Sequence, residues 1–478
     1  MMELIPVIGL EMHAEMNSIT KVFSKGENTF NDISNNHVNK IDLGLPGILP
    51  NLNKECMDKA LEMALILNCD IPDIFIFDRK NYYYPDLPKG YQITQFTKPI
   101  GTNGKLTIEV NGKEKEIDIL DIHLEEDSAS LDHYSYFTLI DYNRAGVPLL
   151  ETVTAPCIHS SDEAVQFLDT MKNIFRYTGI SDADIKRGQI RCDVNVSMME
   201  SNSKELGTKV EVKNVNNIAN VKNVIDYEIK RQTELILSGK KDEIVQETRR
   251  YDEATNTTIS MRSKADAIDY KYFIEPNIPP YKITSDWIEK TKSLIPILPN
   301  EKKLKYINEL GLNSNEANII VKDKDISDYF DELIKLGTDT KLASNWVINQ
   351  INDYINNNDM NIKELYLTPN KLKLILDYIK EDKINSKQAK ELFSKCLELK
   401  KDPTYLIKEL DMEQINDIDS LKTIIINILD NSESQIKEYK NGRTNIYSYF
   451  VGQVMKETKG KANPKLINEI LNDELNNR

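Results

Sequence analysis

The sequence is poor in the features that define secreted, disulfide-bonded and membrane proteins. Its five cysteines are odd in number and scattered, and no two are spaced as C-x-x-C, so neither a disulfide framework nor a cysteine-based zinc site is expected. No stretch reaches the roughly 18–20 consecutive apolar residues of a membrane helix. The first residues have no basic n-region and no Arg/Ser-rich presequence, which predicts neither a signal nor a transit peptide. We expect a cytoplasmic protein with no membrane contact.

The sequence also has fewer basic than acidic residues. The 478 residues include 61 Lys+Arg and 76 Asp+Glu, which gives a formal charge of −15. This acid excess argues against a protein that coats nucleic acid along its whole length. The charge is uneven, however, because residues 1–300 carry −12 and residues 436–478 carry +3. A local basic patch near the C-terminus is therefore compatible with the net charge.

The composition changes near residue 300. Thirteen of the 18 glycines and 14 of the 17 prolines precede it. The first part mixes short β-rich segments with helical patterns at 54–67 and 162–177, which indicates an α+β domain with an antiparallel sheet. From residue 296 the sequence is helical, with breaks near 401–403 and 411–420. We expect three domains, at 1–295, 296–408 and 409–478.

Alternation along four β-rich segments places polar side chains on one face, because residues two apart on a strand point the same way. The shared faces carry Glu11, His13 and Glu15; His123, Glu125 and Asp127; Arg191, Asp193 and Asn195; and Lys209, Glu211 and Lys213. Carboxylates with an imidazole suit a hard divalent cation such as Mg²⁺, and neighbouring Arg and Lys suit phosphate oxygens. The same pattern is typical of amphipathic strands with solvated polar faces, so both interpretations stay open.

Two segments, 77–92 and 141–151, are unusually dense in charged, aromatic and proline residues. Such density indicates loops around a functional site. It also fits purely structural loops, since Pro and Tyr brace turns.

Nine segments, in order along nearly the whole chain, resemble the family of B subunits of bacterial aspartyl/glutamyl-tRNA amidotransferases. They are residues 7–13, 77–95, 123–127, 143–151, 191–196, 207–214, 246–250, 261–273 and 439–466. The resemblance implies a catalytic cradle domain related to the glutamine synthetase and guanido kinase fold, followed by an all-α helical domain and a YqeY-like helical tail. It also implies an ATP-dependent carbon–nitrogen ligase that takes its nitrogen from glutamine.

The implied reaction repairs misacylated tRNA. ATP phosphorylates the side-chain carboxylate of Glu on tRNA(Gln) or Asp on tRNA(Asn), and ammonia then displaces phosphate to leave the amide. The resemblance identifies four catalytic Mg²⁺ ligands, which are Glu11, His13, Glu125 and Glu151. Strand alternation independently points to the first three of these residues, whereas Glu151 rests on the resemblance alone. Four further residues are expected to contact ATP or its phosphates, although a salt-bridged structural face would also explain them: Arg191, Asp193, Lys209 and Lys213.

The chain shows neither an amidase-type Ser-Ser-Lys constellation nor a convincing Cys-His glutaminase arrangement. Ammonia must therefore come from elsewhere, and the resemblance implies a heterotrimer with a glutaminase A subunit, a small C subunit and a polar tunnel into this chain. Tunnel or gate roles are implied for Lys80, Lys89 and Glu126, of which Glu126 points to the opposite face from Glu125. Ordinary surface salt bridges would also account for the two lysines.

The C-terminal stretch 436–466 offers a contact for the tRNA. It holds seven basic and two acidic side chains with three interleaved tyrosines, which suits phosphate pairing and stacking. A solvated basic helix would show the same composition, and the resemblance favours tRNA binding. The residues expected to contact tRNA are Lys440, Arg443, Lys456, Lys459 and Lys461.

The sequence departs from the family pattern in two places. Many members carry four zinc-binding cysteines, whereas the matching positions here are Ser24, Gly26, Asn39 and Asp42, so no zinc is expected. In the run 270–276, Lys271 and Ile274 replace the usual arginine and proline, which leaves the shape of that loop open.

Two other classes of function are compatible with these residues. A non-catalytic tRNA-binding scaffold would leave the Glu/His faces inert. A free-standing ammonia ligase for a small acid, resembling glutamine synthetase, would leave the basic tail without a role. If the chain is an amidotransferase, Asp-tRNA(Asn), Glu-tRNA(Gln) or both are compatible substrates.

Overall fold

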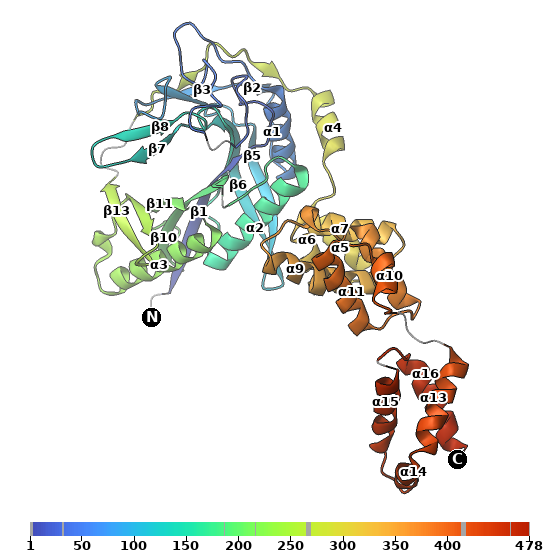
Figure 1. Cartoon of the computed structure of the whole chain (residues 1–478). Helices are drawn as coiled ribbons and strands as arrows, with labels where there is room; N and C mark the ends of the chain where they lie inside the picture. Colours follow the sequence, from blue (N-terminus) through green and yellow to red (C-terminus); the bar gives the residue numbers. More distant parts are fainter. Residues whose placement is uncertain are drawn as a thin grey trace. The chain divides into compact units, whose positions relative to one another are not determined.

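The structure is a computed structural model that describes residues 3–30, 33–185, 187–215, 217–263, 269–412, 417–458 and 460–477. The chain forms two compact units, Met1–Pro299 and Asn300–Arg478, which we describe separately (Figure 1). The described part of the chain contains no helix long and apolar enough to cross a membrane. The predicted sequence of an α+β unit followed by a helical one is confirmed.

An eight-stranded sheet forms the centre of the N-terminal unit. In spatial order its strands are β13 (Thr257–Ser263), β12 (Glu247–Asp252), β11 (Val210–Val215), β10 (Ile190–Glu200), β1 (Leu4–Glu15), β9 (Pro148–Thr154), β6 (Lys113–Glu126) and β5 (Gly101–Val110). All neighbours are antiparallel except β11 and β12. This pair departs from the predicted antiparallel sheet because α3 (Ile218–Leu237) connects the two strands, and a helical crossover returns the chain in the same direction.

Three helices pack on one face of this sheet: α1 (Lys54–Ile66), α2 (Ser161–Thr178) and α3 (Figure 1). Each begins after a side chain that accepts a hydrogen bond from the first turn, namely Asn53, Ser160 and Asn217. The apolar residues of β1 that point toward these helices are buried in the core, and they are Ile8, Leu10, Met12 and Ala14. The alternate residues Glu11, His13 and Glu15 therefore lie on the opposite face.

Three small sheets accompany the large one. They are β14–β3–β4 (Phe273–Ile274, Asp78–Asn81 and Tyr91–Thr94), β15–β2 (Tyr281–Lys282 and Ile74–Phe75) and β7–β8 (Ser130–His133 and Thr138–Asp141). The dense segment 77–92 includes β3 and the start of β4. Its buried Asp78 accepts hydrogen bonds from the backbone N–H groups of Phe96 and Thr97 at 2.8 and 2.7 Å. Part of this segment is thus structural.

Helix α4 (Ser285–Leu294) ends the first unit, which also contains the short 3-10 helix Lys241–Glu243. The second unit is helical. Its elements are α5 (Pro299–Asn308), α6 (Ser314–Val321), α7 (Lys324–Lys335), α8 (Thr340–Trp346), the π-helix Val347–Ile351, α9 (Asn352–Asn357), the 3-10 helix Ile362–Glu364, α10 (Pro369–Lys380), α11 (Ser386–Leu399), α12 (Pro403–Glu409), α13 (Ile418–Asp430), α14 (Glu433–Lys440), α15 (Ile446–Glu457) and α16 (Pro464–Asn476). One hydrophobic core lies within residues 306–412 and another within 421–475. The predicted boundaries at 295 and 408 stay predictions.

Candidate functional site

Four neighbouring strands each contribute one polar residue to a single row of the sheet. Arg191 on β10 pairs with His13 on β1, His13 pairs with Glu151 on β9, and Glu151 pairs with His123 on β6. Residues paired in register point to the same face with their Cβ atoms about 4.5–5.5 Å apart. The row therefore lies on the face opposite α1, α2 and α3.

His13 and Glu151 of this row converge with Glu125, which lies two residues beyond His123 on β6, and we call these three residues the His13 cluster. Each offers one ligand atom, and these atoms all lie within 4.8 Å of one another. His13 Nε2 lies 3.2 Å from Glu151 and 3.8 Å from Glu125. His123 was not among the predicted ligands, yet its Nε2 lies 3.1 Å from Glu151 and its Nδ1 lies 2.8 Å from Asp121. The strand alternation that placed His123 on the face of Glu125 was the signal for it.

The charges of the His13 cluster depend on one another. Burial alone would lower the pKa of His13, but Glu151 and then Glu125 outweigh it and raise this pKa to about 9. Burial and the neighbouring Glu151 raise the pKa of Glu125, whereas the two histidines overcome burial and hold the pKa of Glu151 well below its ordinary value. Two buried carboxylates are thus balanced by imidazolium charge, a role that a bound cation would also serve.

A second cluster, Glu11, Asp193 and Glu211, lies on the same face, and we call it the Glu11 cluster. One carboxylate oxygen from each lies within 4.8 Å of the others. Lys213 Nζ lies 3.1 Å from Asp193 and 3.2 Å from Glu211. The structure therefore separates Glu11 from the other three predicted metal ligands, because Glu11 pairs with Asp193 across the sheet whereas His13 pairs with Glu151. Glu211 completes the cluster, although only its neighbours Lys209 and Lys213 were predicted as site residues.

The four predicted nucleotide contacts lie in three different surroundings. Asp193 and Lys213 belong to the Glu11 cluster. Arg191 donates a hydrogen bond to Asp127 at 2.5 Å, and Arg144 Nε lies 3.4 Å from the same carboxylate. Lys209 is exposed at a separate pocket. Arg144 was missed as a site residue, although it lies in the dense segment 141–151.

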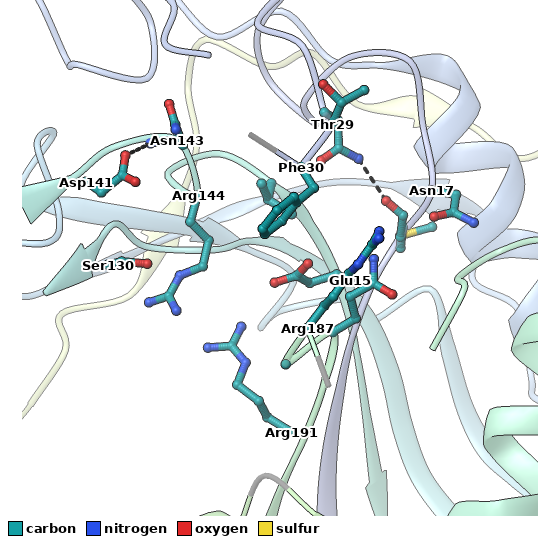
Figure 2. Close-up of a pocket in the computed structure, with 15 residues that line it drawn as sticks. Glu15, Asn17, Thr29, Phe30, Ser130, Asp141, Asn143, Arg144, Arg187 and Arg191 are labelled. Carbon is teal, nitrogen blue, oxygen red and sulfur yellow. Dashed lines mark hydrogen bonds between the residues drawn. The ribbon is translucent and has the colours of Figure 1, made fainter. Parts of the chain in front are cut away.

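Among the described residues, two pockets open on this side of the unit. The larger, which we call the arginine pocket, has a volume of about 350 Å³ and is lined by Glu15, Arg144, Arg187 and Arg191 together with Phe30 and Asn143 (Figure 2). The smaller, the glycine pocket, has a volume of about 210 Å³ and is lined by Gly9, Glu11, Val153, Leu206, Gly207 and Lys209, among others. The arginine pocket is polar and cationic, whereas the walls of the glycine pocket are mainly apolar. In the arginine pocket, burial and then Asp127 raise the pKa of Glu15 to about 7.

The three predicted tunnel residues lie in two places. Lys89 donates to both carboxylate oxygens of Glu126 at 2.5 Å, and the backbone N–H of Ile93 donates to the same group at 2.9 Å. Glu126 faces away from the His13 cluster, as the alternation predicted. Lys80 instead lies over the ring of Tyr270 at 4.9 Å, and Glu125 overcomes burial to raise the pKa of this lysine.

The predicted tRNA contacts are spread over the last helices. Lys440 ends α14, Lys456 lies in the last turn of α15, and Arg443 pairs with Glu438 at 2.8 Å. Lys461 forms an ion pair with Asp411. Lys459 lies outside the described residues. The rings of Tyr439 and Tyr447 are 6.3 Å apart.

A sheet that gathers carboxylates, imidazoles and arginines on one face, beside two pockets, defines a catalytic domain joined to helical modules. Comparison with known proteins identifies it. Residues 6–289 match the family model described as the GatB/GatE catalytic domain, and residues 328–475 match the one described as the GatB domain. The chain belongs to the family of B subunits of aspartyl/glutamyl-tRNA(Asn/Gln) amidotransferases, as the sequence resemblance predicted.

Relatives named as B subunits of aspartyl/glutamyl-tRNA(Asn/Gln) amidotransferase match along their whole length. The protein of Oceanobacillus iheyensis is 45% identical over 476 residues, which cover 99% of both chains. The proteins of Bacillus licheniformis and Bacillus cereus (strain B4264) are each 43% identical, over 99% and 100% of both chains.

Proposed function

We propose that this chain is the B subunit of a heterotrimeric tRNA-dependent amidotransferase and carries its kinase and transamidase steps. It uses ATP to phosphorylate the side-chain carboxylate of Glu-tRNA(Gln), Asp-tRNA(Asn) or both. Ammonia then displaces the phosphate to give Gln-tRNA(Gln) or Asn-tRNA(Asn). Full-length similarity to named B subunits supports this function, and the two clusters on one sheet face carry it chemically.

Phosphoryl transfer needs a cation that holds phosphate oxygens, and both clusters have suitable donors. Carboxylate oxygens and imidazole nitrogen are ligands that Mg²⁺ accepts. Beside the Glu11 cluster lies a buried acceptor without a partner among the described residues, since Asn195 Oδ1 makes no hydrogen bond while Asn195 Nδ2 donates to Glu11 at 2.9 Å. Such an orphaned oxygen supports a cation at this position. We propose Glu11 with Asp193 and Glu211, and His13 with Glu125 and Glu151, as the residues that hold Mg²⁺.

Bound Mg²⁺ would neutralise phosphate charge and orient the phosphoryl group. The side chains of the protein would bind and position ATP and the substrate. We propose that the apolar glycine pocket holds the nucleoside of ATP, with Lys209 at its edge and Lys213 toward the phosphates. Arg191 and Arg144, fixed by Asp127, then face the substrate carboxylate. A carboxylate is a poor electrophile, and phosphorylation converts it into an acyl phosphate that ammonia can attack.

Ammonia is proposed to arrive from a glutaminase A subunit, held with a small C subunit in the complex. Lys80 lies close enough to Glu125 for that carboxylate to raise its pKa, and Glu126, the next residue on β6, pairs with Lys89 on the opposite face. These charged residues on both faces of β6 support a polar path toward Glu125. The basic tail, with Lys440, Arg443, Lys456, Lys459 and Lys461, is proposed to hold the tRNA. The complex would act in the cytoplasm, without zinc.

The experiment combines the heterotrimer with ATP, Mg²⁺, glutamine or ammonium, and both misacylated tRNAs in parallel. We expect amide formation on at least one of them. Glu11→Gln and Glu125→Gln should each reduce it by more than about 100-fold, since residues that bind the metal directly matter more than those that only orient them. Glu116→Gln is the matched control, because Glu116 only forms an exposed pair with Lys105. Full activity in both ligand variants would support a non-catalytic scaffold instead. Amidation of free glutamate but of neither tRNA would support a small-acid ligase.

A further inference from the structure

The arginine pocket contains a carboxylate that has no partner among the described residues. Glu15 lies two residues after His13 on β1, so it shares the face of the His13 cluster and lies about 7 Å further along the strand. Its side chain lines the pocket and points into it (Figure 2). Within the residues that the structure describes, the Glu15 carboxylate accepts no hydrogen bond and forms no ion pair.

Arg144 and Arg191 attract Glu15 electrostatically but form no hydrogen bond or ion pair with it among the described residues, because each donates its hydrogen bonds elsewhere. Arg144 donates to the backbone carbonyls of Ser128 and Ala129 at 3.0 Å each. Arg144 and Arg191 both approach Asp127, at 3.4 and 2.5 Å. The two guanidinium groups extend toward each other from different walls of the pocket (Figure 2). A partly buried carboxylate without a partner is unfavourable, and a cationic group of a ligand would restore its pairing.

The substrate of the proposed function carries one such cation close to its reacting group. In an aspartyl or glutamyl ester the α-ammonium group is three or four bonds from the carboxylate that is activated. The spacing of about 7 Å between Glu15 and His13 on one strand lets a single amino-acid residue reach both. Arg191 and Arg144 line the same pocket as Glu15.

We propose that Glu15 binds the α-ammonium group of the aminoacyl ester at the 3′ end of the tRNA, and that the arginine pocket is the site of this aminoacyl group. The proposal rests on the proposed function. It makes Glu15 a specificity residue that requires a free amino group, while the side-chain carboxylate of the same aminoacyl group extends toward Arg191, Arg144 and the His13 cluster.

The test compares each misacylated tRNA with its deaminated form, in which a hydroxyl replaces the amino group at nearly the same size. The heterotrimer is supplied with ammonium chloride, so that the glutaminase step is not needed, and kcat/KM is measured for both substrates. The wild type should prefer the amino form by roughly 10- to 100-fold, the range of a hydrogen bond to a charged group. Glu15→Gln should reduce the preference to about threefold or less by lowering kcat/KM for the amino form alone.

Two further variants serve as controls. Glu15→Asp keeps the charge and should keep most of the preference, and Glu116→Gln should match the wild type. Equal use of the two substrates by the wild type would overturn the proposal without any variant. An unchanged preference in Glu15→Gln, or an equal loss on both substrates, would also overturn it. A wild-type complex that amidates neither misacylated tRNA would instead refute the proposed function.

Discussion

Lys21 and Asp42 form an ion pair in which both side chains are buried, at 0% and 2% exposure, with Nζ 3.1 Å from Oδ2. Lys21 also donates to the backbone carbonyl of Ala145 at 2.7 Å, and Asp42 accepts a hydrogen bond from the N–H of Asn39 at 2.8 Å. Burial lowers the pKa of Lys21, and Asp42 opposes this shift. Through its bond to Ala145, Lys21 joins the segment before α1 to the loop that carries Arg144, so the paired lysine supports one wall of the arginine pocket.

The positions matched to zinc-binding cysteines in other family members surround this pair. Asp42 is one of them and Asn39 donates to it, while Gly26 lies so close that an added Cβ would be 2.8 Å from the Asp42 carboxylate. Ser24 accepts a hydrogen bond from the N–H of Gly26 at 3.1 Å. These side chains offer neither thiol nor imidazole, which is why we expect no zinc here. The absence of zinc stays a prediction, and metal analysis of the purified chain can check it.

Lys21→Met should destabilise the N-terminal unit by about 3–5 kcal/mol, because it leaves a buried carboxylate without its partner. The double variant Lys21→Met/Asp42→Leu should recover much of this loss, since the buried charge is then gone as well. Urea unfolding followed by circular dichroism measures both. The control is Lys105→Met, whose exposed pair with Glu116 should contribute no more than about 1 kcal/mol. A cost for Lys21→Met as small as that of the control would show that the pair does not stabilise the fold.

Asn195→Ala should separate metal binding from folding. Its Oδ1 is buried and has no hydrogen-bond partner in the described residues, so the cost to the unliganded chain should be about 1.5–3 kcal/mol, from the lost hydrogen bond between Nδ2 and Glu11. If that oxygen serves a cation, the rise in Tm produced by Mg²⁺ should shrink in the variant, because stabilisation by a ligand follows its affinity. Thermal unfolding over a Mg²⁺ titration gives both quantities. An unchanged Mg²⁺ response would remove Asn195 from the cation site.

Strand alternation predicted which face Glu11, His13 and Glu125 share, but not which of them meet. The grouping depends on register: Glu11 lies opposite Asp193, and His13 lies opposite Glu151. Register shifts between Cys192 and Val194 on β10, and between Ile119 and Asp121 on β6, move later residues relative to their partners. No pattern within one strand contains that information.

The residues of the arginine pocket could not be predicted to meet either, because they lie far apart in the sequence. Glu15, Arg144 and Arg191 come from separate segments, and Arg144 stood in a dense loop whose role was open between structure and function. Only tertiary packing makes Asp127 the common partner of both arginines. By contrast, the α+β and helical classes followed from local composition and periodicity, which are properties of each segment alone.

Lys89→Met/Glu126→Gln should distinguish ammonia transfer from chemistry on the tRNA. Lys89 contacts both oxygens of the buried Glu126 carboxylate, and Glu126 faces away from the His13 cluster, so removing both charges together should leave activation of the substrate intact. We expect glutamine-dependent amidation to fall by about tenfold or more, the effect typical of a lost charged hydrogen bond, while amidation with saturating ammonium stays near the wild type. The ratio of the two rates is the measurement. An equal fall in both would assign the pair to folding or to the activation step.

Lys440→Gln and Lys456→Gln should weaken tRNA binding in a salt-dependent way. Both lysines lie at the C-terminal ends of helices in the last core, α14 and α15, where their side chains are exposed. Each phosphate contact that is lost should reduce the slope of log K against log salt concentration by about 0.7–0.9, because fewer counterions are released on binding. Fluorescence anisotropy of labelled tRNA with the whole heterotrimer, over a salt series, measures this slope. Lys335→Gln, at an exposed position that ends α7, is the matched control. If both tail variants keep the wild-type slope, the last helices do not contact the tRNA backbone through these lysines.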